Sequence, residues 1–235
     1  MVFATARVAQ TDPLPALSHQ ERQNWKAIGL VNMAGFRDKS SCTGTLVAPD
    51  LVLTAAHCLE TKNGIKRTRH FVAGWDRGTF AAHRVSAQVF VHPEYFDAKG
   101  SERFKYDIAV MQLEEPIKTT AVMPLLLSDV AALRLGELAV LGYHRKRPNV
   151  INGRFDCSTI SGSAPSVVLL DCEVISGNSG GPVLAAVGDG WKVVAVIAGR
   201  VGGPSPRTLA VPLGDWVMAH WRDALMRADP EGHEG

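Results

Sequence analysis

Short apolar runs separated by turn residues dominate the chain between about residue 28 and residue 212. β-rich runs this short and closely spaced are typical of strands in an all-β barrel or sandwich. In the first half the predicted strands include Val47, Leu51–Leu53, Phe71–Val72, Val85–Val91 and Ile108–Leu113. In the second half they are Leu138–Leu141, Val150–Phe155, Val167–Leu170, Val183–Leu184, Trp191–Ala198 and Thr208–Val211. The pattern therefore predicts an all-β fold class with two β-rich halves.

The periodicity changes after the second half. From Asp215 onward apolar residues recur at helical spacing, which predicts a C-terminal α-helix with Asp215 as its N-cap. The stripe consists of Trp216, Val217, His220, Trp221, Ala224 and Leu225. Because the opposite face is not strongly basic, we expect the stripe to pack on the protein rather than on a membrane surface. Within the second half, Asn152-Gly153 predicts a hairpin turn.

These patterns divide the chain into consecutive segments. We predict an irregular lead at 1–24, a first β-rich unit at 25–122, a connector at 123–134 and a second β-rich unit at 135–212. The helix follows at 213–228, and a frayed tail at 229–235. Ala6-Arg7-Val8-Ala9 fits the end of a signal peptide whose start was removed, which predicts a secreted or periplasmic protein. A short cytosolic leader is the alternative.

Composition excludes two classes of partner. The formal net charge of +2 over 235 residues gives no general signal for binding nucleic acid. The longest strongly apolar run, Val193–Ala198, is far too short for a membrane span. Two local basic loops, at 59–70 and at 144–148, stand out. The first could steer acidic substrates and the second could be a site of proteolytic nicking, but both also fit ordinary solvated loops.

The four cysteines fall as one close pair in each half. Cys42 and Cys58 flank two short runs joined by a turn, and Cys157 and Cys172 flank another such pair of runs. This arrangement predicts two disulfides and an oxidising compartment. Four buried free thiols are the alternative. A zinc site is disfavoured because the chain has no Cys-x-x-Cys pair, and we expect no metal.

The stretch Gly177-Asn178-Ser179-Gly180-Gly181-Pro182 predicts a tight turn that presents one hydroxyl. Such a turn can aim the backbone N–H groups of Gly177 and Ser179 at one point and form an oxyanion hole. A serine hydroxyl needs a base to remove its proton, and that base needs a carboxylate to hold its tautomer. Two candidates lie at the ends of apolar runs, His57 in Thr54-Ala55-Ala56-His57-Cys58 and Asp107 in Tyr106-Asp107-Ile108-Ala109-Val110.

These three motifs, in the order His, Asp, Ser, resemble the trypsin/chymotrypsin family of serine endopeptidases from about Ile28 to the last helix. The resemblance implies two antiparallel β-barrels with the active site in the cleft between them, plus a C-terminal helix. It places His57 and Asp107 on the first barrel and Ser179 on the second. It also implies peptide-bond hydrolysis through an acyl-enzyme. The second half looks more like bacterial members, including the glutamyl endopeptidase branch, than animal trypsins.

The chain departs from the family pattern at several positions. Asn178 stands where animal members carry the aspartate that binds a new amino terminus, and an amide offers no charge for that ion pair. Ala198-Gly199-Arg200 stands where they usually read Ser-Trp-Gly, so a supporting serine hydroxyl is missing and Arg200 could block the pocket wall. Val174 and Ile197 replace a threonine and a histidine usual in glutamyl members, which disfavours glutamate specificity.

Substrate preference depends on Glu173, six residues before Ser179. In trypsin-like enzymes an acid here selects Arg or Lys, so a preference for basic residues is one prediction. A pair between Glu173 and Arg200, or a solvent-facing Glu173, is the alternative. The candidate substrate pocket comprises Glu173, Val174, Ala198, Gly199 and Arg200.

Two other functions compete with an active endopeptidase. A catalytically silent or latent protease-fold binding protein would share the fold, although such relatives usually lose one of the three residues. A periplasmic quality-control protease would share Gly-Asn-Ser-Gly-Gly-Pro, but those proteases carry a peptide-binding domain, and only about fifty residues follow Ser179. We predict a monomer that acts on a peptide or protein substrate, with no cofactor.

Overall fold

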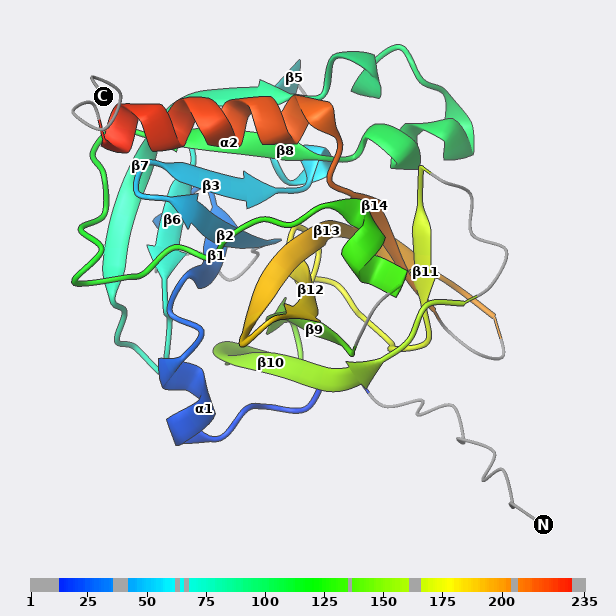
Figure 1. Ribbon diagram of the computed structural model, residues 1–235, viewed down its shortest axis with the longest axis horizontal. Helices are drawn as coiled ribbons and strands as arrows, with labels where there is room; N and C mark the ends of the chain where they lie inside the picture. The colour runs from blue at the N-terminus through cyan, green and yellow to red at the C-terminus, as the bar shows by residue number, and fades with distance from the viewer. Residues whose placement is uncertain are drawn as a thin grey trace.

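The computed structural model describes residues 13–35, 42–61, 64–65, 68–134, 137–160, 166–203 and 207–229. Its strands form two large antiparallel sheets, and a long helix near the C-terminus crosses the outside of the first (Figure 1). The predicted all-β fold class with a C-terminal helix is confirmed. The predicted signal-peptide end at 6–9 lies outside the described residues.

The first sheet is a closed barrel in the order β1-β2-β3-β8-β7-β6. Its strands are β1 (Ile28–Asn32), β2 (Cys42–Ala48), β3 (Leu51–Thr54), β6 (His70–Ala73), β7 (Ala82–Val91) and β8 (Ala109–Leu113). Strand β1 closes it by pairing on both sides, since Leu30 lies opposite Thr43 of β2 and Val72 of β6. Closure leaves no free strand edge.

The second sheet has the order β10-β9-β12-β13-β14-β11. Its strands are β9 (Leu138–His144), β10 (Arg147–Cys157), β11 (Val168–Leu170), β12 (Pro182–Val187), β13 (Gly190–Val201) and β14 (Arg207–Pro212). The outer edge of β10 is covered by the chain before the first barrel, because Leu17 donates its N–H to Ile151 and Gly153 donates to Pro15. This cover protects an edge that would otherwise be free to pair with another chain.

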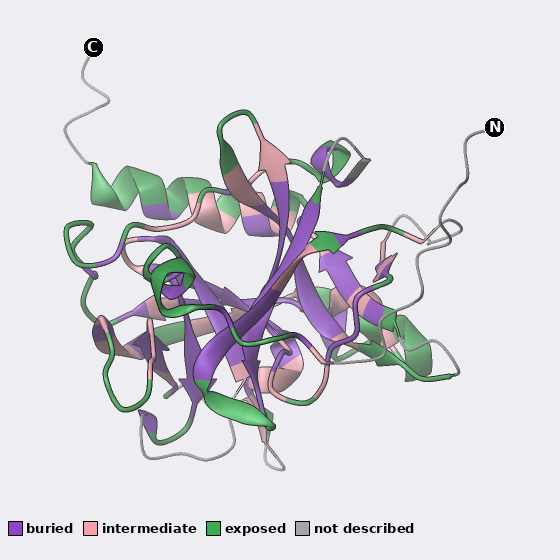
Figure 2. Ribbon diagram, turned by 90° about the horizontal axis from the view of Figure 1, so that it is seen from below, coloured by how far each residue is buried: buried purple, intermediate pink, exposed green. Residues whose placement is uncertain are grey.

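The remaining elements are short, apart from the last helix. They are α1 (His19–Gln23), α2 (Asp215–Ala228), the small pair β4 (Glu60–Thr61) and β5 (Gly64–Ile65), and the 3₁₀ turns Ala56–Cys58, Pro93–Tyr95, Gly100–Tyr106 and Val130–Arg134. Helix α2 is tied to the first barrel, since the indole of Trp221 donates to the carbonyl of Val47 at 2.8 Å and Arg227 lies 2.9 Å from Asp50. Figure 2 shows that the strands are mostly buried, whereas loops and the outer side of α2 are exposed.

Two turn and cap predictions are wrong. Asn152-Gly153 lies inside β10, where Asn152 faces Gly142 of β9, and the chain reverses at Arg145–Lys146 instead. The buried Asn152 amide donates to the carbonyl of Val150, so this Asn-Gly pair forms a local irregularity within the strand rather than a hairpin turn. Helix α2 is capped by Gly214, and Asp215 is its first residue.

The N-terminal lead is also more ordered than predicted. Helix α1 begins after Ser18, whose hydroxyl accepts from the N–H of Glu21 while the Glu21 carboxylate accepts from the N–H of Ser18. This reciprocal pair is a capping box, and the Ser-x-x-Glu spacing that predicts it is present in the sequence. Leu14 is fully buried in the core of the second sheet. The segment therefore joins the second sheet to the first barrel.

Candidate active site

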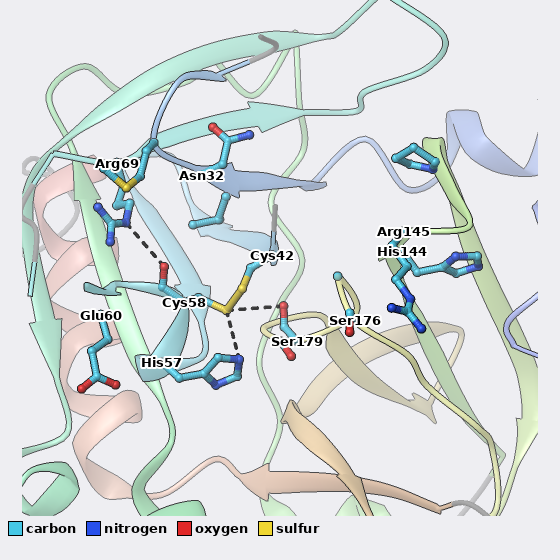
Figure 3. Close-up of a pocket in the computed structure, with 14 residues that line it drawn as sticks. Asn32, Cys42, His57, Cys58, Glu60, Arg69, His144, Arg145, Ser176 and Ser179 are labelled. Carbon is cyan, nitrogen blue, oxygen red and sulfur yellow. Dashed lines mark hydrogen bonds between the residues drawn. A yellow bond between two sulfur atoms is a disulfide. The ribbon is translucent and has the colours of Figure 1, made fainter. Parts of the chain in front are cut away.

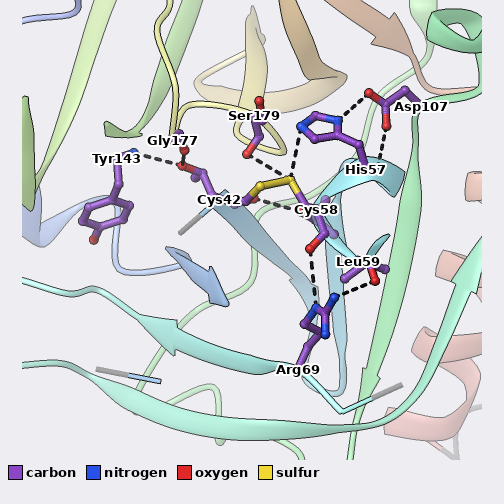
Figure 4. The surroundings of a disulfide bond; sticks show 11 residues. Cys42, His57, Cys58, Leu59, Arg69, Asp107, Tyr143, Gly177 and Ser179 are labelled. Carbon is purple, nitrogen blue, oxygen red and sulfur yellow. Dashed lines mark hydrogen bonds and ion pairs between the residues drawn. A yellow bond between two sulfur atoms is a disulfide. The ribbon is translucent and has the colours of Figure 1, made fainter. Parts of the chain in front are cut away.

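His57 and Asp107 meet because their strands are neighbours. Strand β3 pairs with β8, with Thr54 opposite Ala109; His57 follows β3 within a 3₁₀ turn and Asp107 precedes β8. The ring Nδ1 of His57 lies 2.6 Å from Asp107 Oδ2, and its backbone N–H donates to Oδ1 at 2.9 Å (Figure 4). Asp107 is only 3% exposed. The carboxylate accepts the Nδ1 proton, which leaves Nε2 as the ring atom that can act as a base.

Ser179 lies in a turn whose backbone requires glycine. Gly177 and Gly180 have φ angles of 103° and 80°, in the left-handed region. A Cβ on Gly180 would also lie 2.2 Å from the carbonyl oxygen of Thr43. Thr43, on β2 of the first barrel, donates its N–H to Ser179 and its hydroxyl to Gly177. The turn is therefore held against the barrel that carries His57.

Asn178 fixes the same turn from the other side. Its side chain is fully buried, accepts from the N–H of Ile175 at 3.0 Å and donates to the carbonyl of Tyr143 at 3.2 Å. The neutral amide forms both bonds without a charged partner. An aspartate at this position could not donate to the Tyr143 carbonyl, and its buried charge would need a cationic partner. The amide thus supports the shape of the turn from within this chain.

His57 and Ser179 line one pocket of about 620 Å³, beside the Cys42–Cys58 disulfide (Figure 3). Nε2 of His57 lies 3.8 Å from the Cys58 sulfur, and the Ser179 carbonyl oxygen lies 3.7 Å from the same atom. Among the described residues no hydrogen bond joins the Ser179 hydroxyl to Nε2. Such bonds are often long before substrate binds, so this geometry is compatible with a nucleophile and its base.

Two residues that line this pocket have backbone N–H groups without an acceptor in the described part of the chain. They are Gly177 and Ser179. Buried or half-buried N–H groups are nearly always paired, so a free pair is characteristic of an anion-binding turn. An oxyanion hole at these two groups stays the prediction made from the sequence.

Both predicted disulfides are present. Cys42 bonds to Cys58, and Cys157 bonds to Cys172, with Cα–Cα distances of 5.9 and 5.5 Å. The first bridge places its sulfurs beside His57, and these three side chains together have the spacing of a metal site. Sulfur in a disulfide is not a thiolate, so this grouping lacks the ligands that zinc prefers.

Arg69 is a residue whose role the sequence did not reveal. The sequence placed it in a basic loop, but its side chain is only 1% exposed. Its guanidinium donates to the carbonyls of Leu59 at 2.6 Å and Cys58 at 3.4 Å (Figure 4). It also donates to the carbonyl of Thr68 at 3.3 Å. Burial lowers the pKa of Arg69. The side chain clamps the backbone immediately after His57, and no local sequence signal distinguishes this role from that of a surface arginine.

His144, which the sequence placed in the basic loop at 144–148, is the last residue of β9 and is buried. It is 1% exposed, with Nε2 3.1 Å from the Leu14 carbonyl oxygen and Nδ1 accepting the N–H of Arg147 at 3.2 Å. Burial lowers its pKa. His144 is followed by Arg145, whose N–H donates to the carbonyl of Ser176. It therefore links the N-terminal segment to the strand end beside the Ser179 turn.

A second pocket, of about 230 Å³, adjoins Ser179. Its lining is Arg145, Val174, Ile175, Ser176, Ser179, Gly199 and Arg200. Of the five residues predicted for the substrate pocket, Val174, Gly199 and Arg200 line it, while Ala198 is buried in the core and Glu173 lies behind Arg200. Glu173 Oε1 is 3.0 Å from Arg200 Nη1, so the pairing that the sequence left open is present.

Solved structures share this architecture. A Glu endopeptidase in complex with MPD aligns with a TM-score of 0.70 at 18% identity and covers 95% of this chain and 100% of that chain. Protease Anisep from Arthrobacter nicotinovorans aligns with a TM-score of 0.67 at 17% identity, covering 85% and 95%. At these identities the likeness shows the fold alone.

Neither helix in the described part of the chain is long and apolar enough to cross a membrane.

Sequence comparisons identify the family. Human granzyme H is 30% identical over 184 residues, covering 72% of this chain and 66% of granzyme H. A trypsin from Saccharopolyspora erythraea is 39% identical over 84 residues, covering 34% of each. The chain thus spans slightly less than two thirds of granzyme H and about a third of that trypsin. The family described as a trypsin-like peptidase domain matches residues 42–196, which contain His57, Asp107 and Ser179. The chain therefore belongs to the trypsin-like peptidase family.

Proposed function

We propose that the chain is a serine endopeptidase that uses Ser179, His57 and Asp107. One observation carries the proposal: a buried carboxylate holds His57 by both its ring and its backbone, at the wall of the pocket that Ser179 also lines. A histidine held in this way has its Nε2 free to accept a proton. Family membership supports peptide and protein substrates for the same site.

In the proposed reaction the Ser179 hydroxyl oxygen attacks the carbonyl carbon of the scissile peptide bond while His57 Nε2 takes its proton. Asp107 stabilises the imidazolium that results. The proton then passes to the leaving amine, the C–N bond breaks and an acyl-enzyme ester forms on Ser179. Water, deprotonated by His57, then attacks that ester. The ester C–O bond breaks, His57 returns the proton to the Ser179 oxygen, and the acid is released.

The charge that develops on the carbonyl oxygen needs donors that are already in place. The unpaired N–H groups of Gly177 and Ser179 supply them in this proposal. Because Asn178 and Thr43 already hold the turn, we propose that the site needs no newly released amino terminus for activation. Loss of one such donor typically costs about 100- to 1,000-fold in rate.

The preference for basic residues stays a prediction from the sequence, and the pairing of Glu173 with Arg200 argues against it. The preference depends on the Glu173 carboxylate, which is paired with Arg200 rather than free in the pocket. Peptides that differ only in having Arg, Glu or Leu before the scissile bond test it directly. Equal or lower turnover of the Arg peptide compared with the Leu peptide would contradict the predicted preference for basic residues.

Labelling with a fluorophosphonate probe tests the catalytic proposal. The expected result is one adduct, mapped to Ser179 rather than to the neighbouring Ser176, together with cleavage of a peptide substrate. Ser179→Ala should abolish labelling and lower turnover by about 10⁶-fold. Ser158→Ala, which removes an exposed hydroxyl of the second half, is the matched control and should label normally. An unlabelled, well-folded protein would instead favour the latent or silent binding protein.

We also propose that the protein works in an oxidising compartment, either secreted or periplasmic after removal of a signal peptide. Two disulfides per chain support this, since such bonds persist mainly in oxidising environments. Intact mass under non-reducing conditions, from the native source, should show four alkylation-resistant cysteines and the mature amino terminus. Four free thiols in active native protein would contradict it.

A further inference from the structure

One wall of the pocket beside Ser179 is Arg200, whose guanidinium is paired with Glu173. Glu173 lies three residues after β11, and Arg200 lies on β13; strand β14 separates them, with Thr208 opposite both Leu170 and Arg200. The Thr208 hydroxyl donates to the carbonyl of Cys172 at 2.5 Å, which fixes the residue directly before Glu173. The two charged groups therefore face each other across a fixed segment of the sheet.

The two partners differ sharply in exposure. The Glu173 side chain is 9% exposed, whereas that of Arg200 is 47% exposed. Arg200 lines the pocket, and Glu173 is absent from its described lining. A carboxylate this buried requires a charged partner, and among the described residues the Arg200 guanidinium is the one within bonding distance. Arg200 therefore covers the carboxylate from the pocket side.

No residue in the described lining of the pocket carries a carboxylate, and its two hydroxyls, on Ser176 and Ser179, are uncharged. Val174 and Ile175 are apolar, Gly199 has no side chain, and Arg145 adds another positive charge. A cationic substrate side chain would meet two guanidinium groups before it could reach Glu173. It would also have to displace Arg200 from Glu173. Because Arg200 belongs to the same chain, it competes at a high effective concentration.

We propose that Arg200 acts as an internal substitute for a substrate guanidinium and is the residue that sets specificity at this pocket. The inference rests on the proposed function, because it assigns the pocket to the residue before the scissile bond. With Arg200 in place, Glu173 is satisfied and the pocket admits an uncharged side chain. Removal of the Arg200 side chain uncovers a binding site for guanidinium or amidinium cations. Planar cations of this kind match a carboxylate in two parallel hydrogen bonds.

The direct test measures binding rather than turnover. Benzamidine, an aryl amidinium, is titrated by calorimetry into Ser179→Ala protein and into the same protein with Arg200→Ala. We expect benzamidine to bind the first protein about 10- to 100-fold more weakly than the second, the value of a charged hydrogen-bonded contact. Adding Glu173→Gln to the Arg200→Ala protein should remove the gain. Arg145→Ala removes a positive charge without uncovering a carboxylate and should not create the site.

Two results would overturn the proposal: tight benzamidine binding to the protein that retains Arg200, or binding that survives Glu173→Gln. If Arg200→Ala leaves the Glu173 carboxylate buried without a partner and the protein does not fold, Arg200→Gln serves instead. It keeps an N–H donor while removing the charge, and should show a smaller gain.

In catalytically intact protein, Arg200→Ala should raise the Arg-over-Leu ratio of kcat/KM by at least about tenfold. Failure of fluorophosphonate labelling would refute the proposed function, whereas the benzamidine result stands independently of it.

Discussion

The two halves of the molecule hold their reactive groups by different means. His57 and Asp107 come from adjacent strands of a closed barrel, and the Asp107 carboxylate accepts from the ring Nδ1 of His57 at 2.6 Å and from its backbone N–H at 2.9 Å. Ser179 comes from a turn beside an open sheet, and the shape of that turn depends on two left-handed glycines and on the side chains of Thr43 and Asn178, which donate to the carbonyls of Gly177 and Tyr143. The first half thus positions its reactive groups by a bond between two functional side chains, whereas the second positions its serine by the backbone conformation of a turn.

This difference predicts opposite consequences for mutation. In the first half, changing a functional side chain should remove activity and leave the fold intact, because the barrel closes without it. In the second half, changing a glycine should damage the fold as well, because the turn packs directly on strand β2. Each prediction below tests one side of this contrast.

Among the variants that test this contrast, the largest effect is expected for Asp107→Asn. The amide keeps the shape and can still accept the backbone N–H of His57, but it favours the wrong imidazole tautomer. We expect kcat to fall by about 10⁴-fold with little change in melting temperature. Steady-state kinetics and thermal melting measure the two quantities. Asp97→Asn, an exposed residue of the same half, is the control. A variant retaining more than a tenth of the activity would contradict the assigned role.

Gly180→Ala should mainly cost stability. The new Cβ would lie 2.2 Å from the Thr43 carbonyl oxygen, and the φ of 80° would be strained as well. We expect a loss of more than about 4 kcal/mol in the free energy of unfolding. Gly188→Ala is a matched control, because Gly188 has a φ of 60° but no atom within 4 Å of its Cβ position, so only about 1–2 kcal/mol should be lost. Equal losses in denaturant melts would show that packing on β2 is unimportant.

The two disulfides offer a comparison at nearly equal loop length. Their sequence separations are 16 and 15, so removing either pair by double alanine substitution should cost about 3 kcal/mol. Only the Cys42–Cys58 bridge adjoins His57 and the Ser179 turn, so only its loss should also lower kcat. Melts and kinetics on both double variants check this. A drop in kcat for the Cys157–Cys172 variant alone would reverse the argument.

The sequence predicts much of this arrangement because the signals are local. Apolar runs of strand length, a Gly-rich turn and paired cysteines each leave a pattern within a few residues. The clamp by Arg69 leaves none, since its acceptors are backbone carbonyls at 58, 59 and 68, which any residues provide. The pairing of Leu14–Leu17 with β10 also leaves no local pattern, because it joins segments that are far apart in the sequence. The wrong prediction at Asn152-Gly153 shows that strand pairing can override a turn motif when the asparagine amide finds an acceptor inside the sheet.

The smallest effect concerns the link between the N-terminal segment and the second half. Burial lowers the pKa of His144, and the nearby cations Arg147 and Lys146 add to this, while the bond to the Leu14 carbonyl opposes it. As pH falls, the unfolded chain therefore takes up the proton first. The contribution of His144 to stability is present above about pH 6.5 and is lost as pH drops below that value.

His144→Gln keeps a donor for Leu14 without a titrating group, so it should flatten the fall in unfolding free energy between pH 7 and pH 5. The change is at most about 1.4 kcal/mol per pH unit. Part of the slope should remain, because burial also lowers the pKa of His83 and of His92, both in the first half. Denaturant melts at several pH values measure the slope, with His220→Gln as a control on helix α2. An unchanged slope for His144→Gln would mean that acid sensitivity comes from the first barrel, and that the N-terminal cover of β10 does not depend on this histidine.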